Sequence, residues 1–439
     1  MNRTLDETHD PKAASWVESA NSFQTDFPIQ NLPFGLFRAR DQDRSSIGVA
    51  IGECVLDLNA AAVADCLQEL SRATVAACQT DSLNELMSLD VQSRLRLRRH
   101  LFDLLQASAG ASVREAVEGF LVPARDLDMQ LPARIGDYTD FYASIFHATN
   151  VGSLFRPDNP LLPNYKWVPI GYHGRSSSLM ISGTEIRRPH GQTMAENAST
   201  PIFDMSGSLD YELEIGAYVA GGNRLGQPIP MAEAEEHIFG LSLVNDWSAR
   251  DIQSWEYQPL GPFLSKSFAT TLSPWVITME ALTPYRCPSF ARPAGDPQPL
   301  PYLDSESNRQ RGAIDLTVEA TLSSAEMREQ KISPIRLSLA SFREMYWTLA
   351  QLLAHHSSNG CNLRPGDLLA SGTVSGSAAE SRGCLLELTR RGGQKIELPT
   401  GEQRRYLEDG DEVVLRGWCE RPSAMRIGLG ECKGRIQSE

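Results

Sequence analysis

One strand-like stretch, SLDYELEIGAYV at residues 208–219, restricts what this chain can fold into more than any other segment. Apolar side chains from Leu213 to Ala217 alternate with the two-residue period of a β-strand, and the opposite face carries Glu212 and Glu214. Two carboxylates this close repel each other, so either one is protonated or a cation lies between them. The apolar continuation favours a sheet wall that lines a cavity over an exposed strand face, where paired acids are solvated.

The composition narrows the class of partner. The 439 residues are enough for two or three domains, and 41 basic against 55 acidic residues give a net charge of −14. This charge disfavours nucleic acid or an anionic membrane surface as the main partner. The eight cysteines form no C-x-x-C pair, and no stretch has the apolar length of a signal peptide or a membrane span. We therefore expect reduced thiols and a cytoplasmic protein.

The sequence pattern divides the chain into three parts. Residues 1–22 are polar and aperiodic, and we expect a disordered lead. Residues 23–131 begin with short β-like runs and continue with helices. Pro123 and Pro132 bracket a connection, and residues 132–439 are β-rich with abundant Gly and Pro.

Two helices are predicted with more detail. Residues 83–106 place leucines along one stripe and Arg94, Arg96, Arg98 and Arg99 mostly outside it, which is typical of a solvated helix face. A second helix follows Ser341, which with Glu344 forms a capping-box pattern, and it stops at Gly360.

Three further segments carry residues suited to chemistry. The stretch DYTDFYASIFH contains Asp140, Tyr142 and His147, although a single histidine is more often structural. The stretch NDWSARDIQ contains Asp246, followed by a predicted short helix that places Arg250 and Gln253 on one face. Lys266, among small and aromatic residues, is a candidate buried cation, whereas Trp247 and Trp255 are attributed to packing.

The third segment is LASGTVSGS, followed by CLLELT. Gly372 and Gly376 allow backbone amides to approach a ligand closely, and the hydroxyls of Thr373 and Ser375 lie beside them. Glu387 is predicted to lie in a strand with apolar neighbours.

Taken together, these segments predict one site. Asp140, Glu212, Glu214 and Asp246 supply only oxygen ligands, which is the donor set of a hard divalent cation. His147 and Glu387 suit a general base and the group that orients it, and Arg250, Gln253 and Lys266 suit the stabilisation of negative charge.

In this order, the segments resemble the fumarylacetoacetate hydrolase family. The resemblance extends from DFPIQNLPFGLF at residue 26 to GLGECKGRI near the end, and it is most specific in IGDYTDFY, HATNVG, GYHGR, NDWSARDIQ and GCNLRPGDLLASGT. It implies a mainly β fold: a small N-terminal SH3-like β-barrel, then a larger mixed β-roll catalytic domain. It also implies a homodimer that contains Ca²⁺ or Mg²⁺.

The resemblance also implies a role for each matching residue. The metal ligands would be Asp140, Glu212, Glu214 and Asp246. The catalytic residues would be His147, Glu387, Arg250, Gln253 and Lys266. The substrate would contact Tyr142, Arg156, Tyr172, Arg250, Gln253, Tyr257 and Thr373, and Lys266 with Thr270 would border a second cation position.

The activity implied by the resemblance is metal-dependent hydrolysis of the carbon–carbon bond of the β-diketone fumarylacetoacetate. The products are fumarate and acetoacetate, and the reaction is the final step of tyrosine and phenylalanine degradation. The alternatives are an acylpyruvate hydrolase or a 2-oxo acid decarboxylase or hydratase of the same fold. A cation-stabilised binding protein would leave His147, Glu387 and Lys266 without a purpose.

Overall fold

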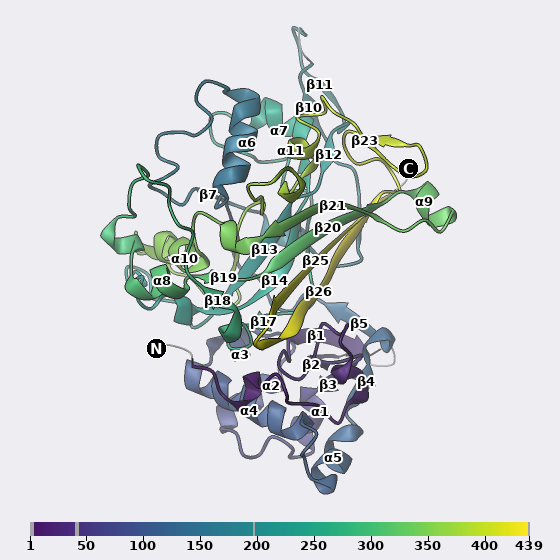
Figure 1. Cartoon of the computed structure of the whole chain (residues 1–439), viewed down its shortest axis with the longest axis vertical. Coiled ribbons are helices and arrows are strands. Elements are labelled where there is room, and N and C mark those ends of the chain that lie inside the picture. Colours follow the sequence, from purple (N-terminus) through teal and green to yellow (C-terminus); the bar gives the residue numbers. More distant parts are fainter. Residues whose placement is uncertain (1–3, 40–43, 196–197, 438–439) are drawn as a thin grey trace.

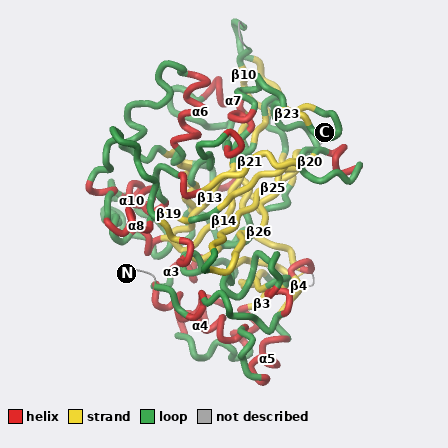
Figure 2. Tube along the Cα trace, viewed as in Figure 1, coloured by secondary structure: helices red, strands yellow, loops and turns green. Residues whose placement is uncertain are grey.

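The computed structural model describes residues 4–39, 44–195 and 198–437. The chain is mainly β, which confirms the expected class, and it has a smaller N-terminal part below a larger part in the view of Figure 1. Figure 2 shows the strands concentrated in the middle of the larger part, with long loops and short helices around them. No helix among the described residues has the length and apolar character of a membrane span.

The N-terminal part is built on one antiparallel sheet of five strands in the order β4-β3-β2-β1-β5. Its strands are β1 (Phe34–Ala39), β2 (Ser45–Ile51), β3 (Cys54–Asp57), β4 (Leu121–Pro123) and β5 (Leu127–Gln130). Its helices are α1 (Leu58–Val63), α2 (Arg72–Cys78), α3 (Asn84–Ser88), α4 (Val91–Leu105) and α5 (Ala111–Glu118). Because β4 and β5 are the two ends of the strand order, the SH3-like barrel stays a prediction.

The larger part contains an eight-stranded mixed sheet in the order β7-β6-β22-β13-β14-β16-β8, with β17 paired to β14. Its strands are β6 (Tyr138–Phe141), β7 (Gly171–His173), β8 (Leu179–Ile181), β13 (Leu213–Val219), β14 (Ile238–Asp246), β16 (Thr270–Leu272), β17 (Ile277–Thr278) and β22 (Leu368–Ala370). The β6–β22 and β8–β16 pairs are parallel and the other pairs are antiparallel.

A second, five-stranded sheet packs beside the first one, in the order β21-β20-β25-β26-β9. Its strands are β9 (Glu185–Ile186), β20 (Thr317–Ser323), β21 (Ile335–Ser341), β25 (Glu412–Arg421) and β26 (Ala424–Ile436). Ile215 and Leu243 of the first sheet belong to the same buried cluster as Val318 and Leu415 of the second. Every residue of β13 is buried, because Tyr218 on its other face belongs to a second buried cluster, which includes residues of the N-terminal part.

The remaining elements surround these sheets. Four short antiparallel pairs are β10 (His190–Thr193) with β11 (Ile202–Met205), β12 (Leu209–Asp210) with β15 (Ser248–Ala249), β18 (Arg286–Cys287) with β19 (Ala313–Ile314), and β23 (Ile396–Glu397) with β24 (Gln403–Arg404). The helices are α6 (Ile145–Phe155), α7 (Arg250–Glu256), α8 (Glu306–Arg311), α9 (Ala325–Glu329), α10 (Leu349–Ser357) and α11 (Leu385–Leu388).

The prediction of a disordered lead over residues 1–22 is wrong for its described part, residues 4–22, and residues 1–3 lie outside the described residues. Two 3₁₀ turns, Glu7–His9 and Glu18–Asn21, hold this segment against the fold. His9 contacts the carbonyl of Glu280 through Nε2 at 2.9 Å, and the Ser15 hydroxyl donates to the Leu105 carbonyl at 2.7 Å. Polar side chains here make tertiary hydrogen bonds, which a polar, aperiodic sequence does not reveal.

The prediction that the arginines of α4 lie on a solvated helix face is only partly confirmed. Arg96 and Arg99 are exposed, but Arg94 and Arg98 are buried. The guanidinium of Arg98 donates to the hydroxyl and carbonyl of Thr8 and to the carbonyls of Gln30 and Asn31, at 2.5–3.3 Å. Arg98 thus fastens the N-terminal segment to α4.

The capping box of the second predicted helix lies further along the chain than expected. Ser341 precedes a single 3₁₀ turn, Phe342–Glu344, and α10 begins only at Leu349. The side chain of Thr348 accepts from the Gln351 amide, and the Gln351 side chain accepts from the Thr348 amide. Both pairs fit the same i, i+3 pattern, so the sequence alone did not distinguish them.

Candidate active site

Four carboxylates converge where the strands of the eight-stranded sheet end. Asp140 lies near the end of β6, Glu214 in β13, Glu212 just before β13, and Asp246 is the last residue of β14. Strand β22 pairs with both β6 and β13, and β13 pairs with β14, so the sheet places these side chains next to one another. All four are buried, and one oxygen from each lies within 4.8 Å of the others.

Two cations from outside the sheet neutralise part of this cluster. The Lys266 ammonium donates to Glu212 Oε2 at 2.6 Å and to Asp246 Oδ2 at 2.8 Å. Arg250, at the start of α7, lies 2.8 Å from Glu212 through Nη2. The hydroxyl of Thr270 donates to Asp246 Oδ1 at 2.7 Å. Thr270 and Lys266 thus both bond to Asp246, while the second cation position that they were predicted to border stays a prediction.

Tyr172, on β7, links two of the acids. Its hydroxyl lies 2.8 Å from Asp140 Oδ2 and 2.9 Å from Asp246 Oδ2. Burial, together with the neighbouring carboxylates of Asp140 and Asp246, raises the pKa of the Tyr172 hydroxyl well above its ordinary value. The phenol therefore stays protonated and acts as a donor to the cluster.

The paired glutamates of the opening stretch have different surroundings. Burial by itself would raise the pKa of Glu212, but the charges of Lys266 and Arg250 outweigh it and hold this pKa below its ordinary value. Burial and the charges of Asp140 and Glu212 raise the pKa of Glu214 well above its ordinary value. The sequence left two possibilities open, a protonated acid or a nearby cation, and both apply to this pair: the raised pKa favours a protonated Glu214, and cations lie next to Glu212.

The unpaired oxygens show that the cluster fits a divalent cation. Neither oxygen of Glu214 has a hydrogen-bond partner among the described residues, and the same holds for Oδ1 of Asp140. Buried carboxylate oxygens without partners are costly unless a cation binds them. An all-oxygen set of this size is the donor set of a hard cation such as Ca²⁺ or Mg²⁺.

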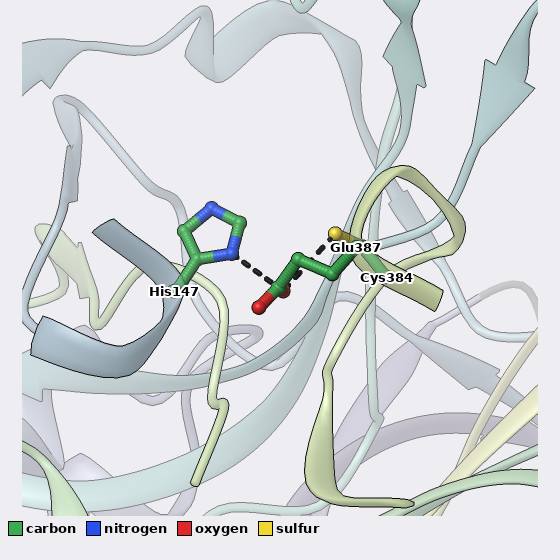
Figure 3. Close-up of side chains that lie close together, drawn as sticks. All are labelled: His147, Cys384 and Glu387. Atoms are coloured by element: carbon green, nitrogen blue, oxygen red, sulfur yellow. Dashed lines mark hydrogen bonds and ion pairs between the residues drawn. The ribbon is translucent and has the colours of Figure 1, made fainter. Parts of the chain in front are cut away.

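A histidine–glutamate pair forms a second group at this site; Figure 3 shows His147 and Glu387 directed toward each other. His147 is in the first turn of α6, where the Ser144 side chain accepts from its backbone amide and caps the helix. Its Nδ1 lies 2.6 Å from Glu387 Oε2, and both side chains are buried. Glu387 lies in the short helix α11, so its predicted place in a strand is wrong. Four residues of mainly apolar sequence did not distinguish a buried helical turn from a strand.

The hydrogen bonds of Glu387 fix its charge. Asn150 Nδ2 donates to Oε1 at 2.8 Å, and Ser375 Oγ donates to Oε2 at 2.8 Å. The Cys384 thiol lies 3.3 Å from the same oxygen (Figure 3). Burial would raise the pKa of Glu387, but the charge and hydrogen bond of His147 and the other donors lower it below its ordinary value. Glu387 is therefore an anion that accepts from every neighbour.

The carboxylate cluster and the histidine open onto one cavity of about 630 Å³. The residues predicted from the sequence that line it are Asp140, Tyr142, His147, Arg156, Tyr172, Glu212, Arg250, Gln253, Tyr257, Lys266 and Thr373. The predicted residues Glu214, Asp246, Thr270 and Glu387 are not among its lining residues and lie behind them. The structure thus brings all the predicted residues to one place, some facing the cavity and some supporting those that do.

One glycine is required beside the cavity. Gly372 follows β22 with a φ of +75°, and a Cβ atom there would lie 2.1 Å from the carbonyl oxygen of Phe141. Only glycine allows the chain to pass this close to the end of β6. The neighbouring Thr373 lines the cavity, and its hydroxyl has no hydrogen-bond partner among the described residues.

The chain matches models of known protein families. Residues 138–437 match the family model described as fumarylacetoacetate (FAA) hydrolase C-terminal, which covers more than half of the chain. The chain belongs to the fumarylacetoacetate hydrolase family. Residues 30–132 match a second model, fumarylacetoacetase N-terminal.

Two curated members of the fumarylacetoacetate hydrolase family show how far the similarity extends. The chain is 47% identical to the fumarylacetoacetase of Rattus norvegicus over 415 residues, which cover 94% of this chain and 96% of the relative. It is 47% identical to the fumarylacetoacetase of Bos taurus over 417 residues, with the same coverage. A solved fumarylacetoacetate hydrolase from Exiguobacterium antarcticum shares the fold, with a TM-score of 0.50 at 16% identity and coverage of 93% of this chain and 100% of that one.

Sequence reasoning missed one buried acid that connects the two halves of this family site. Asp210 accepts from Arg250 Nε at 2.8 Å and from the backbone amides of Leu385 and Leu386 at 2.7 and 2.9 Å. It thereby joins the arginine beside the carboxylates to the helix that carries Glu387. The signal was present, because Asp210 continues the two-residue alternation of Glu212 and Glu214.

Three other members of the site were also missed. Asn150 lies one helical turn after His147 and shares its face of α6, so helical spacing could have indicated it. Arg391 and Tyr406 line the cavity from the segment after α11. No local pattern marks these two, because they follow an irregular stretch of the chain.

Proposed function

We propose that this protein hydrolyses the carbon–carbon bond of fumarylacetoacetate, giving fumarate and acetoacetate, the last step of tyrosine and phenylalanine degradation. The observation that carries the proposal is that the His147–Glu387 pair and the four carboxylates flank one cavity. A general base beside a cation site suits the attack of water on a β-diketone, since a bound cation would polarise the carbonyl that is attacked. The similarity to curated fumarylacetoacetases over almost the whole chain supports the same substrate.

Asp140, Glu212, Glu214 and Asp246 would hold a divalent cation, which we propose to be Ca²⁺ or Mg²⁺. When bound, such a cation polarises the two oxygens of a β-diketone and offsets the charge that develops on them. The partnerless oxygens of Glu214 support this assignment, because they require a cation or a proton in the folded protein. The other three ligands are held by hydrogen bonds: the Tyr172 hydroxyl bonds to Asp140 and Asp246, and the Lys266 ammonium bonds to Glu212 and Asp246.

His147 takes the proton of the attacking water. Because Glu387 is an anion and only accepts, the hydrogen between the two side chains belongs to His147 Nδ1, so in the neutral imidazole Nε2 is the acceptor. Nε2 can then accept a proton from water at the cavity wall, and Glu387 stabilises the imidazolium that forms. Asn150 and Ser375 hold Glu387 in place during this step.

The departing acetoacetate leaves as an enolate, and its charge must be met by donors. Arg250 Nη1 bonds to Gln253 Oε1 at 3.1 Å, and both side chains line the cavity together with Lys266. Burial would lower the pKa of Lys266, but Asp246 and Glu212 raise it above its ordinary value, so the ammonium keeps its charge. We assign the stabilisation of the leaving group to these three side chains.

The remaining cavity residues are proposed to bind the substrate. Arg156, at the end of α6, would pair with a terminal carboxylate, and Tyr142, Tyr257 and Thr373 would donate hydrogen bonds to substrate oxygens. All four line the cavity. The hydroxyl of Thr373 and the Nε of Arg156 are buried without hydrogen-bond partners among the described residues, which supports a role toward a ligand.

An acylpyruvate hydrolase or a 2-oxo acid decarboxylase or hydratase of the same fold is the alternative. The match of residues 30–132 to the N-terminal model of fumarylacetoacetases disfavours it. The finer expectations belong to this proposal as well: an SH3-like barrel within residues 23–131, a catalytic domain over 132–439, a homodimer and a cytoplasmic location.

The proposal is tested with purified protein, fumarylacetoacetate and added Ca²⁺ or Mg²⁺. Loss of the diketone absorbance, with fumarate and acetoacetate formed in equal amounts, is the expected result. Turnover of acylpyruvates with no turnover of fumarylacetoacetate would favour the alternative. Release of carbon dioxide instead of acetoacetate would identify a decarboxylase.

A further inference from the structure

A guanidinium without an anionic partner lies at the rim of the cavity. Arg391 lines the cavity, and its Cζ lies 4.7 Å from the centre of the Phe155 ring. Phe155 is the last residue of α6, next to Arg156. Among the described residues, none of the ion pairs or side-chain hydrogen bonds includes the Arg391 guanidinium. A stacked, planar cation is thus held at the opening with its donors available.

Two of the other cations that line the cavity already have anionic partners. Arg250 pairs with Asp210 and Glu212, and Lys266 pairs with Glu212 and Asp246. Arg156 Nη2 bonds only to a backbone carbonyl, that of Pro160, at 3.3 Å. The cavity therefore offers two guanidinium groups that no carboxylate of the described chain neutralises, Arg156 and Arg391, both beside the end of α6.

The backbone fixes where Arg391 lies. Its φ is +58°, a left-handed conformation that is unusual for a residue other than glycine, and its amide donates to the Leu386 carbonyl at 2.8 Å. Leu386 itself lies in α11 and lines the cavity. The same short helix thus positions Glu387 for the base and anchors the turn that presents Arg391.

We propose that Arg391 binds a second carboxylate of the substrate at the cavity mouth and so makes the site selective for dicarboxylates. Planar guanidinium groups bind carboxylates through two parallel hydrogen bonds, and stacking on an aromatic ring reduces the freedom lost on binding. In a chain of net charge −14, a dianionic ligand needs such local cations at the entrance. This inference rests on the proposed function, since it names which class of diketone the site prefers.

The experiment compares Arg391→Met with Arg390→Met. Arg390 is the matched control, because it is also exposed, also has a positive φ of 49°, and is not among the cavity-lining residues. Each variant is assayed with fumarylacetoacetate and with two analogues, each of which has a methyl group in place of one terminal carboxylate. Analogues that do not turn over are measured as competitive inhibitors.

Arg391→Met should raise KM for fumarylacetoacetate by about three- to tenfold and leave kcat within about twofold, because the contact is the same in the ground and transition states. It should have this effect on one analogue and none on the analogue that lacks the carboxylate bound by Arg391. Arg390→Met should match the wild type. The dependence of kcat/KM on salt should weaken only in Arg391→Met.

Equal shifts for both analogues, or no difference between Arg391→Met and Arg390→Met, would overturn the proposal. If wild-type protein does not hydrolyse fumarylacetoacetate, the proposed function fails, and calorimetric titration with fumarate then tests Arg391 independently. Weaker fumarate binding by Arg391→Met than by Arg390→Met would support the dicarboxylate site. Unchanged binding, or no binding by the wild type, would refute it.

Discussion

Replacing Glu387 by glutamine tests the assignment of the base most directly. The change keeps the shape of the side chain but removes the charge that His147 Nδ1 contacts at 2.6 Å. The carboxylate of Glu387 accepts from four donors, in His147, Asn150, Ser375 and Cys384, whereas an amide offers only one oxygen. With the amide nitrogen toward His147, the imidazole must present Nδ1 as acceptor, which places the proton on Nε2 and removes the base. With the amide reversed, the tautomer survives, but the imidazolium loses its counter-charge.

Either arrangement removes most of the general-base contribution, which is typically about 10²- to 10⁴-fold in rate. This corresponds to about 2.7–5.4 kcal/mol in the activation free energy. KM should change little, because Glu387 does not line the cavity. Steady-state kinetics at several pH values, with thermal unfolding to check the fold, measure the effect.

Glu397→Gln is the matched control, since Glu397 is exposed in β23 and the substitution makes the same change of charge. The pH dependence of stability offers a second measurement. Because the pKa of Glu387 is lowered in the folded protein, its ionised form stabilises the fold above the ordinary pKa of 4.5, and that contribution is lost as the pH falls through the folded-state pKa. Glu387→Gln should lack this part of the acid sensitivity. A kcat within about threefold of wild type across the pH range would refute the pairing of His147 with Glu387 as the catalytic base.

Four further substitutions test other parts of the structure. Glu214→Ala should lose bound divalent metal and activity with the fold retained; full metal content by elemental analysis would remove Glu214 from the ligand set. Lys266→Met should lower kcat more than it raises KM, because its charge is needed most in the transition state, and a change in KM alone would contradict that role. Arg156→Ala should do the reverse and raise KM with kcat nearly kept, and kinetics that match the wild type would exclude a substrate contact. Arg98→Met should lower the free energy of unfolding in urea by about 2–4 kcal/mol, since it leaves buried carbonyls without donors. Substitution of the exposed Arg96 by methionine should have little effect on stability. Equal stability of the two variants would contradict a stabilising role for the hydrogen bonds of Arg98.

The opening stretch shows what the sequence determined by itself. The alternation of apolar and acidic residues around Leu213 predicted both the strand β13 and the placement of Glu212 and Glu214 on its other face. Local periodicity depends only on backbone geometry, so it can be recognised without a fold. The family resemblance then related residues of distant segments to one another, and the structure brings them to the same cavity.

The tertiary structure alone decided which polar residues are buried and which groups they contact. Asp210 and Arg250, 40 positions apart, meet because β12 and β15 pair, and Glu387 reaches His147 across 240 positions. The N-terminal segment is ordered over its described part because Arg98 binds Thr8, although its own sequence has no apolar period. The residue type alone does not show whether a polar side chain lies in an exposed loop or in a buried hydrogen-bond network. Its partner is set by packing between distant segments, which no local pattern encodes.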